Sequence, residues 1–378
     1  MKNSRSRRRR SPLRIGLLVV ALAFVVLVLL VAFTGRVQQP VYDGRPALAW
    51  AADLAVAEEA KRARAAAAIN AIGPEVVPTL VWGLGRGDSL FSARLTAAES
   101  HLPARLWRWL FGVFKPYEAT QQRAAAARAF QFVSGDTGPG LGALAHALGD
   151  PQPEVVNAAA ESLAHLGSDA ASAIAAELPK LSKPAQVAAL NALGTIGSDA
   201  QVALPTIIEM LASTKDSALA NLIGSTLHRI GPESIPPLLE LLTDSDNTVL
   251  LHTRNALLTL AGDDIQAFYR LTAVFPKQPL PIRRQILQVY GEIHAHSRRV
   301  ALALAEALND PEPEIRETAA TTLRQAYTYD TVAGIVADKT EDLRSRVRAV
   351  YADRQTPIQA PAVILTNTTP AAGPPAHP

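Results

Sequence analysis

The chain has 378 residues, 19% of them charged and none of them cysteine. The lack of cysteine excludes disulfides, thiolate zinc sites and cysteine nucleophiles. Good helix formers such as Ala and Leu dominate and aromatic residues make up only 5%, so the composition predicts an all-helical fold.

The positive charge is concentrated at the N-terminus. Residues 1–14 contain seven Lys and Arg side chains and no acid. Because the whole chain has a formal net charge of +3, the remainder carries −4, which is 3 minus 7. A mildly acidic body lacks the basic surface that neutralises phosphates, so we do not expect nucleic acid as a partner.

An uninterrupted apolar run extends from Ile15 to Phe33. As a helix it spans roughly 28 Å, close to the ~30 Å hydrocarbon core of a bilayer. The positive-inside rule then predicts a single-pass protein with residues 1–14 in the cytoplasm and the rest extracytoplasmic, in the periplasm. A cleaved signal peptide is the alternative, although such signals have apolar regions of only about 7–15 residues. Residues 34–45 are expected to form a linker.

The strongest internal signal is a repeated turn. Residues 148–155 recur with conservative changes at 308–315, so the sequence offset is 160, or five periods of 32. Such a period indicates stacked helical units, none of which can bury its apolar face alone. We expect left-handed glycines to end helices at similar intervals. These are Gly135, Gly167, Gly197, Gly231 and Gly262.

Residues 232–260 illustrate one unit. Pro232 fits the first helical turn, where its missing N–H has no helical acceptor. The Asp/Ser/Asn-rich turn at 243–247 can supply an N-cap for the second helix. Apolar residues at helical spacing predict one buried stripe. They are Ile235, Leu238, Leu239 and Leu242.

The turn and the second helix after it carry a family resemblance. The matching residues are Asp310, Pro311, Ile315, Arg316, Ala319, Ala320 and Leu323. The pattern resembles HEAT repeats, which implies an all-α protein, an α-solenoid of about nine helical hairpins over residues 46–354. The resemblance also implies a ladder of Asp–Arg pairs, broken in the unit at 138–167 because Val156 replaces the usual arginine. Second helices are expected near 57–72, 119–134, 153–166, 184–196, 217–230, 247–261, 281–295, 313–326 and 341–353.

The segment 42–50 precedes the first repeat. Its Tyr-Asp-Gly-Arg-Pro-Ala-Leu-Ala-Trp sequence resembles the lead-in of bacterial membrane-anchored HEAT-repeat proteins, which follows a transmembrane helix. We expect Tyr42, Leu48 and Trp50 to cover the exposed face of the first repeat, since a terminal repeat needs a cap. The resemblance implies topology and no activity.

Repeat two is interrupted by an aromatic and basic insertion at 89–119. Long insertions are often functional, and Trp and Arg are favoured at binding hot spots and membrane interfaces. Two interpretations remain open, namely contact with a partner or membrane, and folding back on the N-terminal end of the solenoid. The candidate contact residues are Arg105, Trp107, Arg108, Trp109, Phe111 and Phe114.

The sequence offers no catalytic or metal-binding motif. It has no His-Glu dipeptide of the kind used by HEAT-like di-iron hydroxylases, no His-x-x-x-His and no Gly-x-Ser-x-Gly. We therefore predict no enzyme activity, metal or cofactor, and a membrane-tethered scaffold that binds protein or peptide partners. The alternatives are a HEAT-like lyase or chaperone subunit handling a bilin-type cofactor, and a nucleic-acid-binding repeat module. Residues 355–378, rich in Pro, Ala and Thr, are expected to be a disordered tail.

Overall fold

A computed structural model describes residues 39–85, 116–293 and 297–352. The predicted membrane helix from Ile15 to Phe33, the tails and all six candidate contact residues lie outside them. By the clustering of its contacts the chain divides into two compact units, Met1–Ala188 and Ala189–Pro378. The division falls inside α11 (Lys183–Ile196). Each unit is described separately below.

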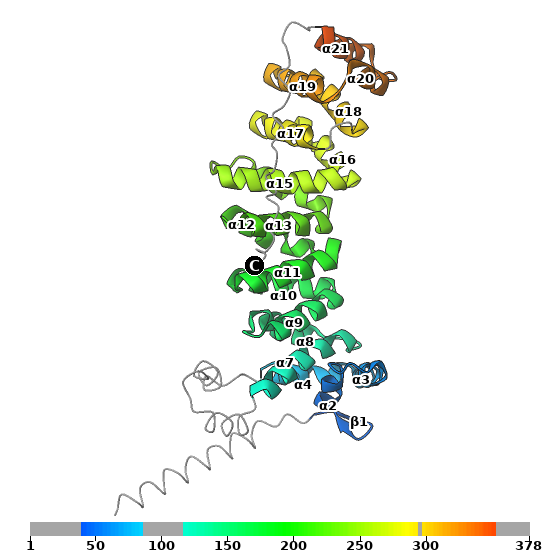
Figure 1. The fold of residues 1–378 in the computed structure, drawn as a ribbon, viewed down its shortest axis with the longest axis vertical. Coiled ribbons are helices and arrows are strands. Elements are labelled where there is room, and N and C mark those ends of the chain that lie inside the picture. The colour runs from blue at the N-terminus through cyan, green and yellow to red at the C-terminus, as the bar shows by residue number, and fades with distance from the viewer. Residues whose placement is uncertain (1–38, 86–115, 294–296, 353–378) are drawn as a thin grey trace, which may run out of the picture. The chain divides into compact units, whose positions relative to one another are not determined.

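The first unit begins with a small antiparallel hairpin, followed by helix pairs (Figure 1). In the hairpin, Val41 is paired with Pro46 and Tyr42 with Arg45. Among the paired helices, α7 packs on α9, and α8 packs on both α4 and α10. First and second helices thus form two adjoining layers. The elements are β1 (Val41–Tyr42), β2 (Arg45–Pro46), α2 (Ala47–Asp53), α3 (Glu59–Ile72), α4 (Val77–Leu84), α7 (Pro116–Ala129), α8 (Gly138–His146), α9 (Pro153–Leu166) and α10 (Ser168–Glu177).

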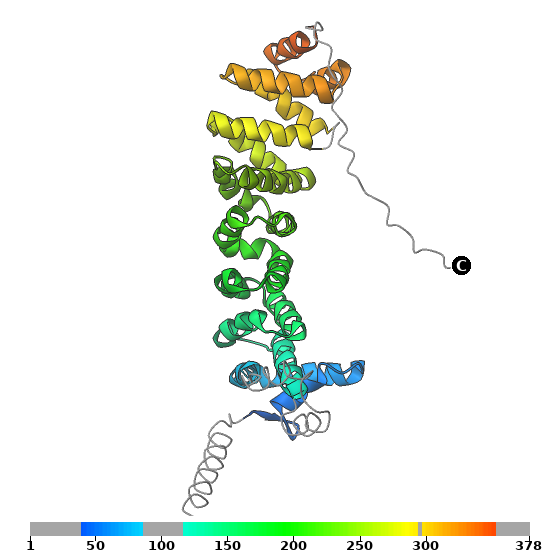
Figure 2. The same ribbon diagram turned by 60° about the vertical axis from the view of Figure 1, so that its left-hand side comes forward.

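The second unit repeats this arrangement (Figure 2). Its second helices pack in the order α13, α15, α17, α19 and α21, and first helices pack beside them. This stacking is the α-solenoid architecture that the sequence predicts. The elements are α12 (Leu204–Ser213), α13 (Ser217–Ile230), α14 (Ile235–Leu241), α15 (Asn247–Asp263), α16 (Ile265–Val274), α17 (Leu280–Glu292), α18 (Arg298–Glu306), α19 (Pro313–Ala326), α20 (Tyr329–Ile335) and α21 (Glu341–Ala352).

The unit that begins at Pro232 follows the predicted construction. Pro232 opens a 3-10 turn, η7 (Pro232–Ser234), that leads into α14. The carboxylate of Asp246 accepts a hydrogen bond from Thr248 N at 2.7 Å and caps α15. The whole predicted stripe is buried, namely Ile235, Leu238, Leu239 and Leu242.

One predicted helix end is wrong. Gly262 lies inside α15 and does not have a positive φ. The helix ends instead at Asp263, and the next residue, Asp264, has an extended backbone (φ −100°). The carboxylate of Asp264 caps α16 by accepting from Gln266 N at 2.8 Å. A side-chain cap therefore replaces the left-handed glycine. The other four predicted glycines, Gly135, Gly167, Gly197 and Gly231, have positive φ.

The first repeat is built differently from the expected one. Helix α2, rather than α3, packs along α7. In α3 only Ala65, Ala68 and Ile69 are buried, and residues 59–64 are all exposed. The sequence pattern located both helices but could not tell which of them contacts the second repeat.

The predicted linker at 34–45 overlaps the hairpin, which holds Trp50 in place. Trp50 Nε1 donates to the carbonyl of Tyr42 at 3.0 Å. The guanidinium of Arg45 lies 4.1 Å from the ring centroid of Trp50 and pairs with Asp53 at 2.9 Å. Trp50 is therefore buried, whereas Tyr42 stays 43% exposed and packs edge-on against the Trp50 ring, with centroids 6.5 Å apart. The last residues of the predicted insertion, 116–119, belong to α7.

Among the described residues, one stretch of 26, Glu59–Leu84, is long and apolar enough to cross a membrane by composition. It consists of α3 and α4, separated by a 3-10 turn whose first residue, Gly73, has φ +65°. Both helices contribute buried residues to the first unit. We interpret the stretch as two helices of the stack rather than as one spanning helix.

Two glycines of α8 give a matched test of this packing. A Cβ at Gly140 would lie 2.5 Å from a ring carbon of buried Phe130, whereas a Cβ at Gly142 would meet nothing within 4 Å. Gly140→Ala should therefore lower the free energy of unfolding by about 1–3 kcal/mol. Gly142→Ala should be neutral or stabilising by up to about 1 kcal/mol. Hydrogen exchange of α7 and α8 amides measures both, and equal effects would contradict the described contact.

Candidate functional site

The first unit has a groove of about 450 Å³ at its N-terminal end. This volume is within the range of roughly 300–1,000 Å³ typical of ligand sites. The groove lies between the α2–α3 turn, one face of α7 and the first turn of α9. Its lining residues are Leu48, Ala52, Ala55, Val56, Gln121, Gln122, Ala125 and Glu154.

The groove has an apolar side and a polar side. The apolar side, called the apolar floor below, comes from α2 and the turn after it, where Ala52, Ala55 and Val56 are exposed to solvent beside Leu48. Gln121 and Glu154 bring an amide and a carboxylate to the opposite side. Such a surface can bind an apolar side chain and orient it through a few polar contacts.

Short side chains make the hollow possible. Helix α7 packs against α2, α4 and α9, and its residues 124–127 are all alanines with at most 3% exposure. Alanine allows helix axes to approach closely because interaxial distance depends on the side chains at the contact. Because the Ala125 side chain is a single methyl group, the part of the groove next to it stays unfilled.

A buried ion pair fixes α7 against the start of α9. Arg123 donates from Nε to Asp150 Oδ2 at 2.7 Å and from Nη2 to Oδ1 at 3.2 Å. Asp150 Oδ1 also accepts from Gln152 N at 2.8 Å. Asp150 lies in the turn before α9, shortly ahead of Glu154, so this pair sets the position of Glu154 relative to Gln121.

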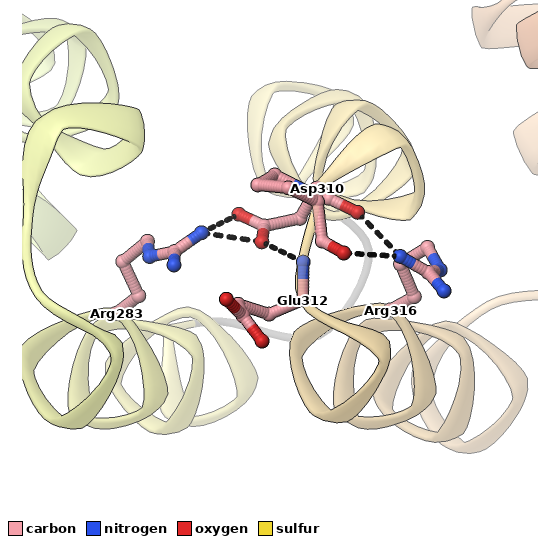
Figure 3. Close-up of polar contacts among 5 residues, drawn as sticks. Arg283, Asp310, Glu312 and Arg316 are labelled. Atoms are coloured by element: carbon pink, nitrogen blue, oxygen red, sulfur yellow. Dashed lines mark hydrogen bonds and ion pairs between the residues drawn. The ribbon is translucent and has the colours of Figure 1, made fainter.

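The second unit contains the same clamp at the sequence offset of 160 (Figure 3). Arg283 of α17 pairs with Asp310, and the two residues are 7% and 8% exposed. Asp310 Oδ1 accepts from Glu312 N at 2.9 Å, as Asp150 does from Gln152 N. The two clamps thus share their residue types and their spacing, and Asp150 is somewhat more exposed than Asp310.

The predicted break in the Asp–Arg ladder at Val156 is wrong for Asp150. At Asp150 and Asp310 the arginine comes from the preceding second helix, so Asp150 is paired although Val156 is apolar. Arg316 donates instead to the carbonyls of Asp310 and Pro311, both at 2.8 Å (Figure 3). The ladder therefore links adjacent repeats and does not run within one.

One difference between the two clamps concerns the groove. Glu314, the counterpart of Glu154, pairs with Arg284. The counterpart of Arg284 in α7 is Ala124, which is fully buried. Glu154 pairs with Arg128 at 3.5 Å and remains half exposed. In the part of the chain that the structure describes, the groove thus contains a carboxylate without the close arginine of its counterpart.

The pKa shifts in the described residues accompany structural contacts away from the groove. Hydrogen bonds from Lys215 and from Thr248 N lower the pKa of Asp246, the N-cap of α15, to about 2. Burial raises the pKa of Tyr351 to about 12. Tyr351 donates to the carbonyls of Leu323 and Tyr327 near the end of the second unit. Within the described ranges, no group of three or more His, Asp or Glu side chains is placed to hold a metal ion.

The groove was not predicted from the sequence. The predicted contact residues, from Arg105 to Phe114, lie outside the described residues, so their prediction stays untested. Alanines and glutamines form no recognisable motif. The available signal was the offset of 160, which aligns Glu154 with Glu314 and Ala124 with Arg284.

No protein-family model and no curated protein matches the sequence. Solved structures do match at low identity. An engineered protein from a structural genomics consortium is 18% identical, with a TM-score of 0.32, and the match covers 81% of this chain and 88% of that one.

Two further matches are a TOG-domain array and importin beta. A TOG-domain array, described in a study of tubulin recruitment by microtubule polymerases, is 10% identical with a TM-score of 0.27, and the match covers 80% and 90% of the two chains. Importin beta is 13% identical with a TM-score of 0.29, and the match covers 80% of this chain and half of that one. With TM-scores this low, the architecture rests on the helix packing described above.

The clamp at the groove can be tested by removing its arginine. Arg123→Met should cost about 3–5 kcal/mol because it leaves the buried carboxylate of Asp150 unpaired. Arg128→Met removes a more exposed, longer contact from the same helix and should cost about 0–1 kcal/mol. Hydrogen exchange of the first-turn amides of α9 in the full chain measures the difference. Equal costs would contradict the role given to Arg123.

Proposed function

We propose that this chain is a membrane-tethered, non-enzymatic scaffold whose repeats bind protein partners, with the groove of the first unit as a principal contact. The observation that carries the proposal is the groove itself. Its walls come from the α2–α3 turn, from α7 and from α9, so it depends on the packing of neighbouring repeats. No single helix pair could provide it.

The rigidity of the groove supports a binding role. Arg123 and Asp150 join two of its walls through a bidentate, buried contact. A preformed surface loses little conformational entropy when a partner binds, so more of the contact energy appears as affinity. Repeat stacks use extended surfaces of this kind for binding.

The proposed tether places the groove near a bilayer. Only the short segment 34–47 separates Leu48 from Phe33, the end of the apolar run. Even fully extended, a segment of that length spans about 50 Å. The partner is therefore expected at or near the membrane surface, on the side opposite the basic tail at 1–14.

Photo-crosslinking in cells tests the scaffold. A photoreactive residue is placed singly at Val56 in the groove, and at Val202 and Leu251, both exposed positions of the second unit. The full chain carries a tag at each end. We expect a reproducible protein adduct at Val56 and both tags on one band in the membrane fraction.

Two results would count against the proposal. Absence of protein adducts at all three positions contradicts a protein-binding scaffold. Loss of the N-terminal tag from the membrane-bound chain contradicts an uncleaved tether.

A further inference from the structure

The charge of the groove points to the chemistry of its occupant. In the second unit the carboxylate of Glu314 has a close arginine, Arg284. In the first unit the position equivalent to Arg284 is Ala124, and Arg128 reaches Glu154 only at 3.5 Å. That separation is at the outer limit of a hydrogen bond, so it compensates the carboxylate poorly.

The apolar floor adds a second requirement. The floor is an apolar surface that the other lining side chains leave open. It is formed by Leu48, Ala52, Ala55 and Val56. The volume of about 450 Å³ has room for a large aliphatic or aromatic side chain with part of its backbone. A ligand that satisfies both features carries a cation beside a bulky apolar group.

We propose that the groove binds a segment of a partner protein in which an arginine lies next to a large apolar side chain. The guanidinium contacts Glu154, as Arg284 contacts Glu314 in the second unit, and the apolar side chain lies on Ala52, Ala55 and Val56. This inference rests on the proposed scaffold function and names the chemistry of its partner.

Arginine fits better than lysine because its planar guanidinium can bond both oxygens of a carboxylate in a fixed orientation. Glu154 and its contact with Arg128 are partly exposed, so an ion pair there contributes modestly. Burial of the apolar side chain therefore supplies most of the affinity, and the arginine fixes the direction in which the segment lies.

Fluorescent twelve-residue peptides provide the probe. Each has an Arg-Phe or Phe-Arg pair in a Gly/Ser background, and each is matched by a peptide with citrulline, a neutral isostere, in place of arginine. Binding is measured to the full chain in lipid nanodiscs. For the wild type, citrulline should weaken binding by roughly three- to fivefold, and in Glu154→Gln the two peptides should bind within about 1.5-fold.

Two pairs of variants distinguish binding in the groove from general effects of a substitution on the protein. Ala52→Trp fills the groove from an exposed position and should weaken binding at least about tenfold. Ala60→Trp introduces the same side chain on exposed α3 and should bind as the wild type. Glu161→Gln, an exposed position of α9 outside the lining, is the matched control for Glu154→Gln.

Several outcomes would overturn the inference. These are equal affinity for arginine and citrulline peptides, insensitivity to Ala52→Trp, and no binding at about 1 mM peptide. Binding that emerges only after Trp107→Ala and Trp109→Ala would assign the groove to the chain's own segment instead of a partner.

The crosslinking result separates this failure from failure of the scaffold. If protein adducts form but arginine and citrulline peptides bind equally, the scaffold proposal is supported and the proposed arginine contact is contradicted. Selective peptide binding without any adduct in cells supports the chemistry and rejects the scaffold.

Discussion

At two turns of the described chain, an arginine from one second helix binds the aspartate in the turn of the next helix pair and attaches one repeat to the next. Arg123 with Asp150 and Arg283 with Asp310 are two buried cases. Each aspartate also accepts a backbone N–H two residues on, so a single carboxylate orients the turn and attaches it to the preceding repeat. Because no pair buries its apolar face alone, these contacts join neighbours that also pack through their apolar faces.

The candidate site depends on the Arg123–Asp150 contact and on one sequence difference between the two units. The clamp places the first turn of α9 beside α7, and Glu154 lies in that turn. Where the second unit has the exposed arginine Arg284, the first has Ala124 buried against neighbouring helices. The groove beside α7 is lined by short residues such as Ala52, Ala55 and Ala125 and has the half-exposed carboxylate of Glu154 at its edge. The glutamate position that pairs with Arg284 in the second unit lines the groove in the first.

The sequence was sufficient to locate the helices, but it did not show which residues and helices contact one another. The predicted second helix at 313–326 coincides with α19, because Pro313 and the apolar spacing mark its start and its buried face locally. The partner of Asp150 could not be found in this way, since Arg123 lies 27 residues earlier and the pairing depends on how repeats stack. The packing of α2 on α7 also escaped prediction. Both helices of the first repeat are rich in alanine, so periodicity does not show which one faces the next repeat.

The central claim is that the buried Arg–Asp contact couples adjacent repeats. A double-mutant cycle of Arg283→Met and Asp310→Asn tests it most directly, because asparagine can keep the hydrogen bond from Glu312 N while the charge is removed. Opening free energies are measured by hydrogen exchange of α17 and α19 amides in the full chain. We predict a coupling energy above about 1.5 kcal/mol, seen in both helices. Additivity within about 0.5 kcal/mol would contradict the account.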